Sequence, residues 1–217
     1  MRFVSFNIRH GEGADGRVSI PRIASVLRGA SPDAVCLQEV WRGRLLGNQP
    51  SVLGSTLGMR NAFQGNVRLT HRDFGNLILA RGRLLSSERL SLNSALEPRG
   101  CLLVRIEVGG VRFALATTHL GLDSTERARH LQLLADWLPA TEPLVLMGDF
   151  NTTAEELTPL RGLLAVAEPS PATFPAGHPS AAIDLVAYSQ HWQLESVSAI
   201  PTAASDHLPL VAELVLR

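Results

Sequence analysis

The chain has 217 residues, of which 45% are hydrophobic and 18% charged, as in a globular protein with a sizeable core. Its formal net charge is +0, which excludes an overall positive field that recruits nucleic acid, and it contains no lysine, which excludes lysine-based catalysis. No apolar run approaches the ~18 residues of a membrane span, so we expect a cytoplasmic protein without stable membrane insertion.

Short apolar runs separated by Gly, Pro, Asn and Asp predict a protein built mainly from strands. Gly109 and Gly110 separate two of these runs and indicate a tight hairpin. In chain order the predicted strands are Arg2–Ile8, Ala34–Glu39, Asn76–Arg81, Cys101–Val108, Arg112–His119, Leu144–Asp149, Ile183–Tyr188 and Leu208–Leu214.

Three segments have helical patterns. Pro21–Gly29 carries apolar residues on one face, and Asp123–Trp137 combines an apolar stripe with a capping box of Asp123 and Glu126. A second capping box, Thr153 with Glu156, predicts a helix through Leu164.

Strands outnumber helices and alternate with them irregularly, without repeats or linkers. This pattern predicts one α/β (α+β) domain over residues 1–217, with mixed sheets flanked by helices. Cys36 and Cys101 lie in apolar runs, where reduced core packing is favoured over a disulfide.

The stretch PLVLMGDFNTT places an acid and an amide after a buried strand. Asp149 and Asn151 lie at the carboxyl end of that strand, where ligands bind in α/β sheets. If the extended conformation persists, their i, i+2 spacing points both side chains the same way. Gly-Asp-x-Asn is equally typical of a turn, so this stretch alone favours neither reading.

Other strand ends carry similar side chains. Each of them alone has a structural explanation, as a turn residue or a hydrogen-bonded core residue, but six such coincidences predict one shared site. These residues are Asn7, Glu39, His119, Asp184, Asp206 and His207. Carboxylate and amide oxygens without cysteine suit Mg²⁺, Mn²⁺ or Ca²⁺, and two added histidines fit metal-assisted hydrolysis of a phosphoester.

The segments NIRHG, LQEV, TTHLG, GDFNTT, IDLV and SDHLPL, in this order, resemble the endonuclease/exonuclease/phosphatase superfamily. The resemblance implies its DNase-I-like fold, a four-layered sandwich of two mixed β-sheets packed face to face between helices. It also implies a metal site with Mg²⁺ or Mn²⁺, in which Glu39 and Asp206 bind the metal and Asn7 is a ligand or orienting amide.

The same resemblance implies catalytic roles for the remaining residues. Asp149 matches the acid that activates water, and Asn151 matches an amide that contacts phosphate or metal. His207 matches the histidine on the phosphate, oriented by Asp184, and His119 matches a residue that contacts phosphate or assists the leaving group. Weaker candidates for substrate binding are Arg99, Asn76 and His10.

We therefore expect a metal-dependent phosphoesterase that acts on a phosphodiester, whether a small molecule, a lipid head group or a nucleic acid, without an obligate protein partner. One alternative is a DNA or RNA nuclease that uses the same site, with the Arg-containing segment Asn66–Asn76 as its nucleic-acid patch. The other is a catalytically silent binding module, which the retained site residues disfavour.

Overall fold

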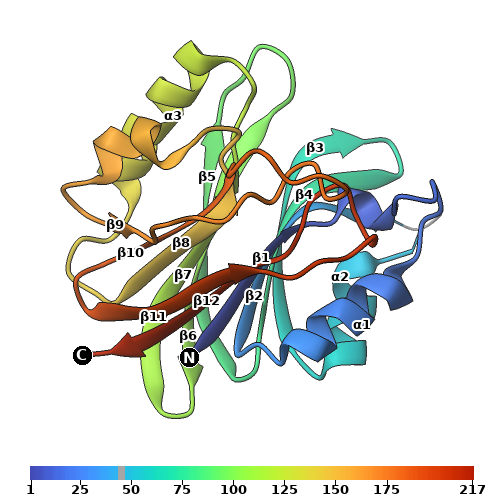
Figure 1. Ribbon diagram of the computed structural model, residues 1–217, viewed down its shortest axis with the longest axis horizontal. Helices are drawn as coiled ribbons and strands as arrows, with labels where there is room; N and C mark the ends of the chain where they lie inside the picture. Colours follow the sequence, from blue (N-terminus) through green and yellow to red (C-terminus); the bar gives the residue numbers. More distant parts are fainter. Residues whose placement is uncertain (44–46) are drawn as a thin grey trace.

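Two six-stranded sheets form the centre of the molecule (Figure 1). The computed structural model describes residues 1–43 and 47–217. The first sheet has the strand order β11 (Trp192–Ala199), β12 (Leu210–Leu216), β1 (Arg2–Asn7), β2 (Ala34–Gly43), β4 (Arg72–Ala80) and β3 (Arg60–Leu69). The second has the order β5 (Arg83–Leu92), β6 (Arg99–Val108), β7 (Val111–His119), β8 (Leu144–Asp149), β10 (Asp184–Tyr188) and β9 (Ala165–Val166).

The inner faces of the two sheets enclose a hydrophobic core. Phe3 and Trp192 of the first sheet meet Phe113 of the second edge to face, with ring centroids 5.6 and 5.5 Å apart, and Phe3 meets Trp192 at 5.7 Å. Such aromatic pairs contribute ~0.5–1.5 kcal/mol each beyond the burial of their surface. This cluster therefore helps to hold the sheets face to face.

Helices cover both outer faces of the sheets, which makes four layers (Figure 1). On the first sheet pack α1 (Ile20–Ala30) and α2 (Gln49–Leu57), and on the second pack α3 (Ser124–Trp137) and the 3-10 helix η2 (Ala154–Leu160). The predicted α/β sandwich of two mixed sheets flanked by helices is confirmed. Over the described part of the chain, no helix has the length and hydropathy needed to span a bilayer.

Each sheet contains one parallel pair of strands at its middle. These pairs are β1 with β2 and β7 with β8, and each is flanked by antiparallel neighbours. In each sheet the parallel strands end on the side where an antiparallel strand begins, β12 in the first sheet and β10 in the second. The last side chains of β1, β7 and β8 therefore lie close to the first side chain of β10 and to the side chains just before β12.

Every strand predicted from the apolar runs is present, with ends shifted by up to four residues. The hairpin at Gly109 and Gly110 is confirmed, because both residues have positive φ, 57° and 82°, and Val108 pairs with Val111. Strands β3, β5, β9 and β11, helix α2 and the 3-10 turn η1 (Arg9–Gly11) were not predicted. Cys36 is buried and free, as is Cys101.

The helix predicted from Thr153 to Leu164 is wrong. The segment forms a 3-10 helix over Ala154–Leu160 that contains Pro159. Proline lacks an N–H donor and its ring clashes with the preceding turn, so an α-helix does not continue through this position.

The two predicted capping boxes differ from the structure. Asp123 does cap α3 by accepting the N–H of Glu126 at 2.8 Å, but the Glu126 carboxylate accepts the N–H of Ala95 instead of closing the box. The Thr153 side chain makes no cap and bonds to the carboxylate of Glu155. The side chains of Glu126 and Thr153 therefore bond to partners other than those that a capping box requires.

Candidate active site

The amide of Asn7 joins two carboxylates that come from different sheets. Its Nδ2 donates to Glu39 Oε1 at 3.1 Å and to Asp149 Oδ2 at 3.0 Å, and its Oδ1 accepts the backbone N–H of Arg9 at 3.1 Å. The reverse orientation of the amide would set its oxygen against two carboxylates and its NH₂ against an N–H. In this arrangement Asn7 orients the two carboxylates, with its own oxygen held by the backbone.

Glu39 lies in a β-bulge of β2. The pairing of β2 with β4 shifts register between Leu37 and Val40, and Glu39 has a φ of 57°. A bulge adds one residue to a strand and re-aims a side chain, often beside an active site. Gln38 points between the sheets and donates to Thr117 Oγ1 at 2.9 Å, whereas Glu39 is turned to Asn7.

Asp149 and Asn151 form a turn after β8. Asp149 Oδ1 accepts the N–H of Asn151 at 3.0 Å, and the Asn151 amide donates to the carbonyl of Leu120 at 2.8 Å. Asn151 has a φ of 51°, so the extended conformation does not persist past the strand. The turn and the site are therefore compatible readings of one stretch: one oxygen of Asp149 closes the turn and the other faces Asn7.

Gly148 allows this strand to approach its neighbour closely. A Cβ atom at this position would lie 2.1 Å from the carbonyl oxygen of Thr118 on β7. Because carbon atoms do not approach a backbone oxygen so closely, only glycine fits there without moving the strands. The glycine before Asp149 thus preserves the pairing of His119 with Asp149.

Two histidines converge on the same oxygen of Asp149. The Nε2 atoms of His119 and His207 lie 3.5 and 3.7 Å from Asp149 Oδ2. The other ring nitrogen of His207 is 2.9 Å from Asp184 Oδ2, which also accepts the hydroxyl of Thr173 at 2.5 Å. Strand ends from β7, β8, β10 and the segment before β12 therefore build one cluster.

The two histidines have opposite electrostatic environments. Burial alone would lower the pKa of His207, but its hydrogen bond to Asp184 and the carboxylates of Asp149 and Asp206 raise this pKa to about 9. Burial lowers the pKa of His119 to about 4, because the nearby Asp149 charge does not offset it and Arg99 opposes protonation. At neutral pH His207 is cationic and His119 is neutral.

The Ser205 hydroxyl links Asp206 to Asn7. The Ser205 hydroxyl contacts the carbonyl of Asn7 at 2.8 Å and Asp206 Oδ1 at 3.2 Å, and Arg9 Nε is 3.7 Å from Asp206 Oδ2. Thr173 and Ser205 hold the site acids but were not predicted from the sequence. Ser205 directly precedes Asp206 in SDHLPL, whereas Thr173 has no signal that separates it from other loop threonines.

Four carboxylates, those of Glu39, Asp149, Asp184 and Asp206, contribute to the charge of the site. Burial raises the pKa of Glu39, and the charges of Asp149 and Asp206 raise it further, although the Asn7 hydrogen bond lowers it. A divalent cation would offset this accumulation of negative charge, and Mg²⁺ prefers carboxylate oxygens. The donor set of Glu39 and Asp206 therefore fits the predicted Mg²⁺ or Mn²⁺.

A second set of ligand-type atoms has a different explanation. Asp149, Asp184 and His207 each offer an atom within 4.8 Å of the others. His207 Nδ1, however, is bonded to Asp184, and a protonated nitrogen offers no lone pair to a metal. This set is better described as a histidine oriented by an acid than as a metal centre.

The three weaker candidates lie in different environments. Arg99 Nη1 is 3.3 Å from His119 Nδ1, which brings Arg99 into the site. Asn76 is buried and donates to the carbonyl of Gly100 at 2.9 Å, a contact that joins the two sheets. His10 stacks on Trp41 with a centroid distance of 4.3 Å, and it lies on the loop after β1.

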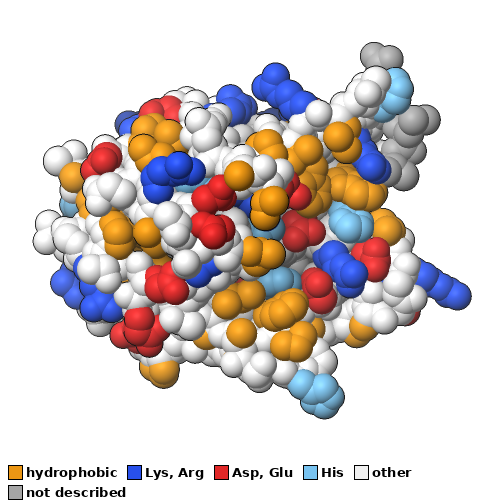
Figure 2. Space-filling view, turned by 90° about the horizontal axis from the view of Figure 1, so that it is seen from above, with side chains coloured by type: hydrophobic (Ala, Val, Ile, Leu, Met, Phe, Trp, Pro, Cys, Tyr) orange, Lys and Arg blue, Asp and Glu red, His pale blue; other side chains and the backbone are white. Residues whose placement is uncertain are grey.

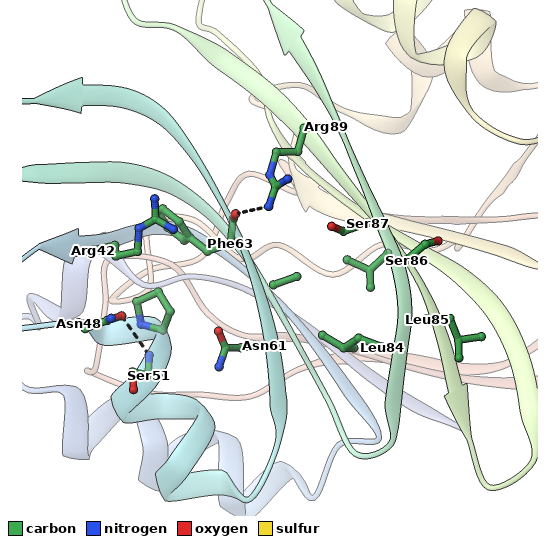
Figure 3. A pocket seen from close by; sticks show the side chains of 13 residues that line it. Arg42, Asn48, Ser51, Asn61, Phe63, Leu84, Leu85, Ser86, Ser87 and Arg89 are labelled. Carbon is green, nitrogen blue, oxygen red and sulfur yellow. Dashed lines mark hydrogen bonds between the residues drawn. The ribbon is translucent and has the colours of Figure 1, made fainter.

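The surface around the site has a distinct composition. Figure 2 shows that acidic and histidine side chains gather at the middle of the face seen from above, with hydrophobic and arginine side chains around them. A separate groove of about 560 Å³ runs between edge strands β3 and β5 (Figure 3). Arg42 and Arg89 flank it, and an adjoining hollow includes Arg60 and Arg83.

The chain is similar to a protein family and to individual proteins over most of its length. A model described as the Endonuclease/Exonuclease/phosphatase family matches residues 4–207. The uncharacterized protein YbhP of Escherichia coli strain K12 is 31% identical over 245 residues, which cover 99% of this chain and 96% of YbhP. The YbhP protein of Shigella flexneri matches with the same identity and coverage.

Solved structures share the fold. An endonuclease/exonuclease/phosphatase from Beutenbergia cavernae has a TM-score of 0.85 at 24% identity, over 100% of this chain and 71% of that chain. A mannosyl-6-phosphatase of Bacteroides thetaiotaomicron has a TM-score of 0.82 at 18% identity, over 100% of both chains. The human Nocturnin catalytic domain has a TM-score of 0.72 at 22% identity, over 100% of this chain and 94% of that chain.

Proposed function

Because the chain belongs to the endonuclease/exonuclease/phosphatase family, we propose that it is a metal-dependent phosphoesterase that hydrolyses a phosphodiester by in-line attack of water. The observation that carries this proposal is the convergence of Asn7, His119 and His207 on Asp149 Oδ2. One oxygen thus lies between an amide that orients it and two ring nitrogens that face an incoming phosphate.

Asp149 is the group that orients the attacking water and accepts its proton. Its burial and its hydrogen bonds from Asn7 and from the backbone of Asn151 hold it in a single position. A preorganised group of this kind lowers the barrier because it needs no rearrangement during the reaction.

His207 and His119 stabilise negative charge that develops on the phosphoryl oxygens. Cationic His207 is held by Asp184 and packs against Phe174 with ring centroids 4.8 Å apart. Charge-assisted hydrogen bonds are roughly twice as strong as neutral ones. The larger share of this stabilisation therefore belongs to His207.

Glu39 and Asp206 are the residues that would hold Mg²⁺ or Mn²⁺, with Asn7 orienting Glu39. When bound, the metal would neutralise phosphate charge and polarise the phosphoryl group. Arg9 lies 3.7 Å from Asp206 and 3.4 Å from Glu12, so it borders the metal residues on the exposed side.

The proposal is tested with purified protein on bis-p-nitrophenyl phosphate and on p-nitrophenyl phosphate, with Mn²⁺, Mg²⁺ or EDTA. We expect metal-dependent release of p-nitrophenol, faster from the diester than from the monoester. A panel of sugar phosphates, inositol phosphates, lipid head groups and nucleotide diesters then ranks the substrates. Monoesters such as p-nitrophenyl phosphate and sugar phosphates are included because the fold is similar to that of a mannosyl-6-phosphatase.

A second candidate function is cleavage of a nucleic acid at the same site. Among the residues that the structure describes, the lining of the groove between β3 and β5 and of the hollow that adjoins it includes Arg42, Arg60, Arg83 and Arg89 and no acidic residue. Arg42 pairs with Asp73 outside this lining, and Arg89 donates to the carbonyl of Phe63. Arginine side chains that line a groove in this way suit a phosphate backbone.

Binding of a labelled single-stranded oligonucleotide, measured against salt concentration, tests this candidate. We expect an affinity that falls steeply with salt and that weakens in Arg89→Ala. An affinity that is equal in Arg89→Ala and in the control Arg161→Ala, an exposed residue directly after η2, would count against it.

A further inference from the structure

The Nδ1 atoms of the two site histidines face groups of opposite charge. Both histidines direct Nε2 toward Asp149. The Nδ1 atom of His207 faces the carboxylate of Asp184 at 2.9 Å, whereas the Nδ1 atom of His119 faces the guanidinium of Arg99 at 3.3 Å.

These partners determine where the ring protons lie. A guanidinium only donates hydrogen bonds, so His119 Nδ1 accepts from Arg99 and carries no proton. The single proton of neutral His119 is therefore on Nε2. A carboxylate only accepts, so His207 Nδ1 carries a proton that is directed at Asp184.

The position of Arg99 is fixed by its surroundings. Its Nη1 also donates to Glu97 Oε1 at 2.6 Å, and its side chain is only 13% exposed. Gly100, the next residue, pairs with His119 across β6 and β7. The carbonyl of Gly100 accepts hydrogen bonds from Asn76 and Thr118, which hold this end of β6 in place.

The buried environment of His119 acts in the same direction. His119 is 6% exposed, and burial disfavours a charged ring. The Arg99 cation beside Nδ1 adds to this effect. A second proton on His119 would both break the hydrogen bond from Arg99 and place two cations in contact.

We propose that Arg99 is a positioning residue that holds His119 in the neutral tautomer protonated at Nε2. Arg99 thus acts through His119, whereas the sequence suggested that it binds the substrate. His119 then donates one hydrogen bond to a phosphoryl oxygen and neither gains nor loses a proton. The assignment of these roles rests on the proposed function, but the tautomer itself does not.

Nuclear magnetic resonance of the ¹⁵N-labelled full chain tests the inference without any substrate. Long-range ¹H–¹⁵N spectra distinguish protonated from unprotonated ring nitrogens, and the loss of one signal set in His119→Gln assigns His119 among the 7 histidines. We expect His119 to show a protonated Nε2 and an unprotonated Nδ1 throughout the neutral range. Protonation at Nδ1, or at both nitrogens, would overturn the inference.

Arg99→Met removes the donor but keeps much of the aliphatic stem. In this variant we expect the protonated-Nδ1 form of His119 to appear, and in the control Arg112→Met, on the exposed side of β7, we expect the wild-type spectrum. An unchanged His119 spectrum in folded Arg99→Met would overturn the proposal. If Arg99→Met does not fold, the wild-type spectrum alone decides. A correct tautomer in a protein that cleaves no phosphoester would contradict only the proposed function.

Discussion

Asn7, at the end of β1 in one sheet, donates a hydrogen bond of 3.0 Å to Asp149, at the end of β8 in the other. The same amide group reaches Glu39 at 3.1 Å. One side chain thus connects a carboxylate assigned to the metal with one assigned to the attacking water.

Replacement of Asn7 by alanine should lower stability. The change removes the donor shared by Asp149 and Glu39, and a buried acceptor left without its partner costs about 1–3 kcal/mol. For a chain of this size 1 kcal/mol corresponds to roughly 2–4 °C in Tm. Thermal unfolding measures the effect, with exposed Asn61→Ala as the matched control. Equal Tm values for both variants would show that the bridge contributes nothing.

Binding of a divalent metal should stabilise the wild type. At a free concentration 100 times its Kd, a ligand that binds only the folded state adds about 2.7 kcal/mol to the free energy of unfolding. We expect Mn²⁺ or Mg²⁺ to raise Tm accordingly and to lose this effect in Glu39→Gln. Glu195→Gln, at an exposed position of β11, should respond as the wild type does. Equal stabilisation of Glu39→Gln would remove Glu39 from the metal site.

Substitution by glutamine should lower kcat less at His119 than at His207. Its side-chain NH₂ supplies a neutral donor near the place of Nε2, which is what His119 provides. We therefore expect His119→Gln to lose less than tenfold in kcat, whereas His119→Ala loses on the order of 10²-fold. His207→Gln should lose nearly as much as His207→Ala, because glutamine does not reproduce a cation held by Asp184. Similar losses in both glutamine variants would contradict the unequal roles.

The sequence predicts the interior of the sheets better than their edges. The eight predicted strands are the ones with a neighbour on both sides, while β3, β5, β9 and β11 lie at the four sheet edges. Interior strands such as LVLMGD are buried along their whole length and form continuous apolar runs. An edge strand such as RLLSSERLSL is mostly exposed, and its polar residues discourage pairing with other chains.

The sequence predicts most of the side chains that the candidate site brings together, but not their contacts. Asp149 and Glu39 could be identified because each follows an apolar run, although β2 does not end at Glu39, as expected, but continues to Gly43. The bulge at Glu39 depends on pairing with β4, and the contact of Arg99 with His119 depends on pairing of β6 with β7. Such relationships arise only when distant segments pack together. For the same reason Asn76 was expected at the substrate, whereas the structure places it in a buried contact with the Gly100 carbonyl.

The most direct test of the central claim is the rate of Mn²⁺-dependent hydrolysis of bis-p-nitrophenyl phosphate by Asp149→Asn. The amide cannot accept a proton from water, so we predict a kcat lower than that of the wild type by about 10²-fold or more. Asp136→Asn, an exposed position on α3, should retain the wild-type rate. A folded Asp149→Asn variant that hydrolyses the diester as fast as the wild type would contradict the proposed active site.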